Sequence, residues 1–162
     1  MDTIVVGVDD SPCSVDAARW AFEEATLRHA RVRAVHAWHP PTPITPAPAR
    51  PPVGLDPGEH RAAAARRLDA ALRKAGLDGA GVEVEKVITQ APATQALIDA
   101  AKDAVLLVVG ARGLGTFAGL ALGHISHQCT LLAPCPVVIV PANSKATAER
   151  AQTRSRDQAV PV

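Results

Sequence analysis

The sequence predicts an α/β fold built around a parallel β-sheet, and three observations indicate it. Five short runs rich in β-branched residues recur along the chain, with helix-like stretches between them. Three of the runs are almost wholly apolar, as strands buried on both faces are. Alanine is abundant, and its small side chain favours helix and lets helices pack close to a sheet. Strands and helices alternating in this way favour parallel strands joined by right-handed crossovers.

The five predicted strands differ in how far their patterns indicate burial. They are Thr3–Val8, Arg31–Trp38, Val82–Thr89, Val105–Val109 and Val137–Val140. The first, fourth and fifth are the apolar ones. The third alternates apolar and charged residues, so one of its faces is exposed and we expect it nearer an edge of the sheet.

Four helices are predicted between these strands. Ser14 is a candidate cap for a helix from Val15 to about His29. The others run from about Gly58 to Ala75, stopping at Gly76, from Pro92 onward, and from about His124 to Leu132.

The length of 162 residues fits a single domain, which we assign to residues 1–141. Residues 142–162 lack an apolar period and are predicted to form a disordered tail. Eight of the 14 prolines lie between Pro40 and Pro57. We expect this stretch, 40–57, to form a stiffened loop after the second strand, poorly ordered unless a ligand or partner covers it.

Composition excludes several classes of function. A net charge of +1 and an aromatic content of 2% argue against a nucleic-acid partner. Asp2 stands where a signal peptide needs basic residues, and no apolar run could span a membrane, so we expect a cytoplasmic protein with no membrane partner. Neither a nucleophile with its base nor a pair of carboxylates is suggested, so we expect no enzyme. His124 and His127 lack a third ligand, so no metal site is predicted.

A glycine-rich segment follows the fourth strand. Gly110 and Gly113 flank Arg112, and Gly123 precedes the last predicted helix. Glycines let backbone N–H groups approach phosphate oxygens, and a helix N-terminus adds further donors. Turn glycines without a ligand are the alternative explanation.

An acidic residue ends the first strand beside the same expected crevice. The carboxylate of Asp9 could accept hydrogen bonds from a ribose or hold a metal ion beside phosphates. For Asp10, a plain turn with Ser11 that leads into a helix is an equal alternative, whereas for Asp9 we favour a functional role.

Three stretches resemble the universal stress protein family. They are Gly-Val-Asp-Asp-Ser at 7–11, Leu-Val-Val-Gly-Ala-Arg-Gly at 107–113 and Ala-Pro-Cys-Pro-Val-Val-Ile-Val at 133–140. The spacing of Gly110, Gly113 and Gly123 is similar to that family's nucleotide pattern. The resemblance covers about residues 3 to 141 and is closest to the actinobacterial branch.

The resemblance implies a Rossmann-like, open five-stranded parallel sheet of order 3-2-1-4-5 with helices on both faces. It implies a crevice between strands one and four in which some members bind ATP while others do not, and we expect ATP here, with or without Mg²⁺. Family members commonly dimerise through the last strand, so a homodimer through Val137–Val140 is expected. The protein would then have a non-catalytic role in regulation or the stress response. The implied nucleotide contacts are Gly7, Val8, Asp9, Ala37 (at the adenine), Gly110, Arg112, Gly113, Gly123, His124, Ile125 and Ser126.

One residue departs from the family pattern. His124 stands where the family has Ser or Thr, and its larger imidazole could fill the space of the terminal phosphates. The alternative function is therefore a nucleotide-free dimeric stress protein that binds a partner, with His124 blocking the phosphate site. Trp38 is a candidate either to roof the adenine or to cover the core.

Overall fold

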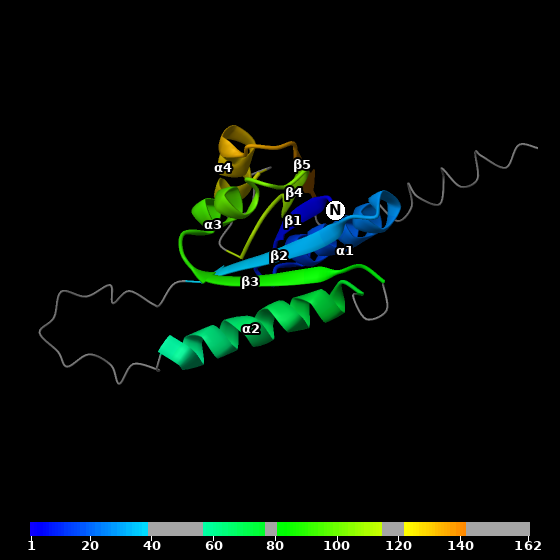
Figure 1. Ribbon diagram of the computed structural model, residues 1–162. Coiled ribbons are helices and arrows are strands. Elements are labelled where there is room, and N and C mark those ends of the chain that lie inside the picture. Colours follow the sequence, from blue (N-terminus) through cyan, green and yellow to red (C-terminus); the bar gives the residue numbers. More distant parts are fainter. Residues whose placement is uncertain (39–56, 77–80, 115–121, 142–162) are drawn as a thin grey trace, which may run out of the picture.

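The computed structural model describes residues 1–38, 57–76, 81–114 and 122–141, which form one parallel sheet flanked by helices (Figure 1). The elements in chain order are β1 (Thr3–Gly7), α1 (Pro12–Arg28), β2 (Arg31–Trp38), α2 (Pro57–Lys74), β3 (Val84–Gln90), α3 (Ala93–Ala100), β4 (Leu106–Gly110), α4 (His124–Leu132) and β5 (Val137–Val140). The strand order is β3-β2-β1-β4-β5, with every pair parallel. This confirms the predicted α/β class and strand order.

The helices cover both faces of the sheet. α1 and α2 pack on one face, and α3 and α4 pack on the other (Figure 1). Alternate residues of β1 point to the two sides, with Ile4 and Val6 in the core under α1 and α2 and Val5 in the core under α3. All three are fully buried. The continuous apolar pattern of β1 therefore follows from its being covered on both faces.

The two edges of the sheet are β3 and β5. The alternating pattern of β3 predicted an edge position, and the structure confirms it. β5 is half-buried throughout and bonds to β4 on its inner side.

The start of α1 differs from the prediction. The N-cap is Ser11, and the helix begins at Pro12 rather than at Val15. The Ser11 hydroxyl accepts a hydrogen bond from the Ser14 N–H at 3.2 Å. Proline suits a first helical position because the N–H that it lacks would have no helical partner there. The prediction that Ser14 is the cap was wrong; its buried hydroxyl donates to the Ser11 carbonyl at 3.0 Å.

The sheet order reverses direction at β1, which has β2 on one side and β4 on the other. The connections that leave β1 and β4 go to opposite faces, so a crevice is expected between the carboxyl ends of these two strands. All elements lie within the predicted domain, 1–141. The proline-rich stretch up to residue 56 and the predicted tail, 142–162, lie outside the described residues. In the part of the chain that is described, no helix is long and apolar enough to cross a membrane.

Candidate functional site

A pocket of about 90 Å³ lies at the carboxyl ends of β1 and β4, on the face covered by α3 and α4. Its lining residues are Gly7, Val8, Asp9, Ser14, Val35, Ala37, Ala93, Leu97, Val109, Gly110, Arg112, Gly113, Ile125 and Ser126. Of the predicted nucleotide contacts, all but Gly123 and His124 line it. The structure thus brings together residues from β1, β2 and the segments after β4; their contact with a ligand stays a prediction.

The sequence analysis missed the apolar wall of this pocket. Ala93 and Leu97 lie one turn apart on α3, while Val35 and Val109 belong to strands. A Cβ added to Gly7 would lie 3.1 Å from a Leu97 methyl group, so α3 packs closely on the end of β1. The alternation of β2 could have suggested Val35, because it shares a face with Ala37. The sequence does not say which helix covers that face, so Ala93 and Leu97 gave no signal.

Gly110 is required by packing whether or not a ligand binds. A Cβ at this position would lie 2.8 Å from both the backbone carbonyl carbon and the Cβ of Cys13. The start of α1 therefore presses directly on the end of β4. The alternative explanation of Gly110 as a structural glycine therefore has direct support.

Asp9 ties the end of β1 to the glycine-rich segment. Its Oδ1 accepts hydrogen bonds from the backbone N–H (3.1 Å) and the hydroxyl of Ser11. Its Oδ2 accepts one from the Leu114 N–H at 3.1 Å. A Cβ at Gly113 would lie 2.6 Å from the same Oδ2, so the absence of a side chain there lets the carboxylate approach. Both oxygens of Asp9 thus have protein partners.

Asp10 has a different environment from Asp9. Its carboxylate accepts a hydrogen bond from Lys74 on α2 at 2.8 Å, and it does not line the pocket. Its backbone has a φ of +66°, a conformation that Asp and Asn adopt more readily than most residues. This favours the interpretation of Asp10 as a turn residue.

The start of α4 is attached to the end of β4. The Ser126 hydroxyl is buried and donates to the Gly110 carbonyl at 2.6 Å, and the Gly123 N–H donates to the Ala111 carbonyl at 2.7 Å. A hydroxyl has one proton to donate, so in this arrangement Ser126 can only accept a further hydrogen bond. The N-cap Gly123 has no side chain, so within the described residues the first N–H groups of α4 receive no side-chain cap.

The two charged residues of the pocket lining are Asp9 and Arg112. Arg112 is exposed, and in the described residues its guanidinium makes no ion pair. His124 is also exposed, on the first turn of α4. Its imidazole does not fill the pocket, so the structure gives no support to blocking at this place.

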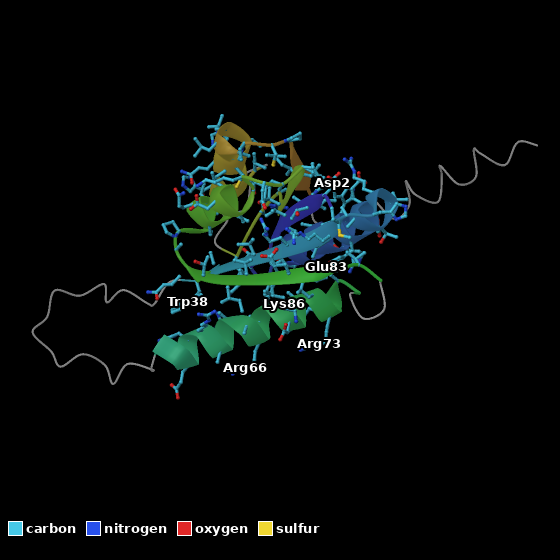
Figure 2. The ribbon with its side chains drawn as sticks, in the orientation of Figure 1. Asp2, Trp38, Arg66, Arg73, Glu83 and Lys86 are labelled. Carbon is cyan, nitrogen blue, oxygen red and sulfur yellow. The ribbon has the colours of Figure 1, made fainter. Side chains whose placement is uncertain are left out.

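Trp38 is not among the residues that line the pocket, and it lies between the end of β2 and the start of α2 (Figure 2). Its indole stacks on the imidazole of His60, with ring centroids 5.8 Å apart. It therefore covers the α2 side rather than roofing the pocket. His36 is buried, and its Nδ1 donates to the Val8 carbonyl at 2.7 Å, which extends the link between β1 and β2. The described segments hold no group of three residues able to bind a metal ion.

The model of the universal stress protein family matches residues 1–141. The chain belongs to the universal stress protein family. Universal stress protein Rv2623 of Mycobacterium tuberculosis is 38% identical over 144 residues, which cover 85% of this chain and 46% of that protein. A universal stress protein of Mycolicibacterium smegmatis is 34% identical over 141 residues, with 85% and 45% covered. The chain thus spans about half the length of these curated relatives.

Solved structures of the family have the same fold as this universal stress protein. One, described as a universal stress protein in complex with cAMP, is 26% identical with a TM-score of 0.60, covering 88% of this chain and 98% of that one. A protein of Archaeoglobus fulgidus in complex with dAMP is 23% identical with a TM-score of 0.61, covering 86% and 98%. A protein of Arabidopsis thaliana with AMP bound is 19% identical with a TM-score of 0.58, covering 91% and 95%. The last two likenesses show the fold alone.

Proposed function

We propose that this universal stress protein binds an adenine nucleotide, with ATP as the candidate ligand, and acts as a non-catalytic cytoplasmic protein of regulation or the stress response. One observation carries the proposal. Asp9, Ala37, Gly113 and Ser126 come from separate segments of the chain, and the fold brings them to one pocket at the point where the strand order reverses. Ligands of open α/β sheets bind at this position.

The chemistry of the pocket suits the parts of a nucleotide. Val35, Ala37 and Leu97 offer an apolar wall for a base, and the Arg112 guanidinium offers a cation for a phosphate. The uncapped start of α4 adds N–H donors beside Ile125. The Asp9 carboxylate already has protein partners, so a Mg²⁺ ion would enter bound to the phosphates rather than in a cage made by the protein.

The test is calorimetric titration with ATP and Mg²⁺, together with thermal unfolding. Ala93→Leu would fill the pocket, and Ala62→Leu makes the same change at an exposed position of α2. We expect the unmodified protein and Ala62→Leu to bind, with a stabilisation of about 2.7 kcal/mol at a hundredfold excess over Kd. Ala93→Leu should lose binding. The absence of both binding heat and a thermal shift at millimolar nucleotide would contradict the proposal.

We also propose that the protein is a homodimer through β5. Val137–Val140 forms an edge strand of four apolar residues, each half-buried. Such an edge favours pairing with another strand, and a second copy would cover it. Sedimentation equilibrium should give twice the chain mass at micromolar concentration, while a monomer throughout that range would contradict the dimer.

His124 decides between nucleotide binding and the nucleotide-free alternative. Because its imidazole is exposed and outside the pocket lining, we expect His124→Ser to change the affinity for ATP only slightly. If the unmodified protein binds no ATP and the serine variant does, His124 blocks the site and the alternative function is supported. Titration of both proteins under the same conditions distinguishes the two.

A further inference from the structure

The two short helices beside the pocket, α3 and α4, lie side by side and are joined by a side-chain hydrogen bond (Figure 1). The Thr94 hydroxyl on α3 donates to Gln128 Oε1 on α4 at 2.6 Å, and both side chains are partly buried. Among the described residues, it is the one side-chain hydrogen bond between these helices. The bond therefore fixes how far apart the two helices lie at this point.

This hydrogen bond lies within one helical turn of the pocket on both helices. Thr94 follows Ala93 directly and precedes Leu97 by one turn, and both of these line the pocket. On α4, Gln128 follows the lining residue Ile125 by one turn. Residues three apart in a helix are neighbours on its surface, so a shift at Thr94 or Gln128 moves a lining residue as well.

The start of α3 has little local support. The helix has 8 residues, and its N-cap, Pro92, gives no side-chain cap. Isolated helices of this length are marginal in water, so tertiary contacts set the position of α3. Its last turn is attached by Arg33, which donates to the Ala100 carbonyl at 2.8 Å. Its first turn is attached by the Thr94 hydroxyl, whose one proton goes to Gln128.

We propose that Thr94 and Gln128 are positioning residues of the nucleotide site, and that their hydrogen bond holds the α3 and α4 walls of the pocket at the spacing that a ligand needs. When a pocket is formed in only a fraction of the molecules, its apparent affinity is reduced by that fraction. Neither side chain carries a charge, so the effect falls equally on ligands of every charge. The inference rests on the proposed function and goes beyond it, because it assigns the order of the pocket to two residues outside the lining.

Calorimetric titration of adenosine, AMP and ATP tests this assignment with four single variants. Thr94→Val removes the hydroxyl and keeps the shape, whereas Thr94→Ser keeps the hydroxyl. Gln128→Met removes the acceptor and keeps the length of the side chain. Thr130→Val is the matched control, because Thr130 is an exposed residue of α4 whose hydroxyl donates to the His127 carbonyl of the same helix.

We expect Thr94→Val and Gln128→Met each to weaken the binding of all three ligands about fivefold, the scale of one net hydrogen bond. Thr94→Ser and Thr130→Val should bind as the unmodified protein does. The double variant of Thr94→Val and Gln128→Met should lose no more affinity than either single variant, because each change already breaks the same bond. Hydrogen exchange at the Ala96 N–H, which donates to the Pro92 carbonyl, should be faster in free Thr94→Val, and saturating ligand should restore its protection.

Several results would overturn the inference. Unchanged affinity in Thr94→Val, or an equal loss in Thr130→Val, shows that the bond does not position the pocket. Tighter binding by Thr94→Val shows that the bond holds the pocket too narrow. A loss that grows with the number of phosphates assigns the effect to charge, and a loss that persists in Thr94→Ser assigns it to side-chain volume. If the unmodified protein binds none of the three ligands, the proposed function fails and the inference fails with it, whereas the other results leave the proposed function standing.

Discussion

The two faces of the sheet are covered in different ways. On one face, α1 and α2 have 17 and 18 residues and extend along the strands. On the other, α3 and α4 have 8 and 9 residues, and the pocket lies beside their first turns. The difference indicates that the long helices supply most of the continuous core, while the short helices leave the carboxyl ends of β1 and β4 open to a ligand.

Truncation of one leucine on each face tests this difference most strongly. Leu68 on α2 is fully buried, and Leu68→Ala should lower the free energy of unfolding by about 3 kcal/mol through loss of burial and creation of a cavity. Leu97 on α3 lines the pocket, so Leu97→Ala widens an existing space and should cost less. Urea unfolding followed by circular dichroism measures both. Equal losses would mean that the pocket face is packed as tightly as the other.

The glycines after β4 provide a second pair. Gly110→Ala would place a Cβ against the backbone of Cys13, which cannot move without shifting α1, so we expect a loss of about 2 kcal/mol. Gly113→Ala meets a carboxylate oxygen, which can turn aside, so its cost in stability should be smaller. Thermal unfolding compares the two.

Comparison of Gly110→Ala with Gly113→Ala also separates an effect on nucleotide binding from an effect on stability. Gly113→Ala should weaken nucleotide binding more than it weakens the fold, because its Cβ would stand in the pocket lining where a ligand approaches the backbone. A double variant with Asp9→Ala should recover most of the stability lost by Gly113→Ala, because the overlapping oxygen is gone. If the two changes are additive, the contact between Asp9 and Gly113 is not as close as described.

The pH dependence of stability reports how completely water is excluded from the Cys129 thiol in the core under α4. Burial raises the pKa of its thiol from an ordinary 9.0 to about 11. Between these values the unfolded chain has lost the proton and the folded chain keeps it, so stability falls as pH rises from about 9 to 11. Cys129→Ala should flatten this part of the pH profile of the unfolding free energy. At pH 8, mass spectrometry should find Cys129 unmodified by iodoacetamide until the protein unfolds.

The smallest expected effect concerns the attachment of α3 at the opposite end of the pocket face. Arg33 on β2 donates to the Ala100 carbonyl at 2.8 Å and to Asp103 at 2.6 Å. The hydrogen bond from Arg33 holds the pKa of Asp103 below its ordinary value. The stabilisation is therefore present above the unfolded pKa of Asp, about 3.9, and is lost as pH falls through the lower folded value.

Asp103 is largely exposed, so this contribution is modest even at neutral pH. The difference in unfolding free energy between the protein and Asp103→Asn should be present at pH 6 and vanish in strong acid. A difference that persists at low pH would assign the effect to packing instead of charge.

The sequence alone determined the class of fold, the strand order by family resemblance, and the neighbourhood of the site. Strands buried on both faces must be apolar throughout, so continuous apolar runs predicted β1 and β4. Alternating apolar and charged residues predicted the edge position of β3. The glycine spacing after β4 marked the site because backbone close to a ligand or a neighbouring helix excludes side chains. The start of α1 differs from the prediction because Ser11 and Ser14 are both suitable caps, and the structure uses Ser11, which places Pro12 at the first helical position.

The tertiary structure alone decided what each of these residues does. The close approach of Cys13 requires a glycine at position 110. The Leu114 N–H donates to the Asp9 carboxylate, and the Ser126 hydroxyl donates its proton to the Gly110 carbonyl. Each is a contact between segments distant in the chain, and a hydrogen bond or a steric overlap depends on distances of a few tenths of an ångström that no local pattern encodes. The sequence thus named the residues of the site, and the packing of α1 and α4 against β4 decided which of their donors and acceptors are left for a ligand.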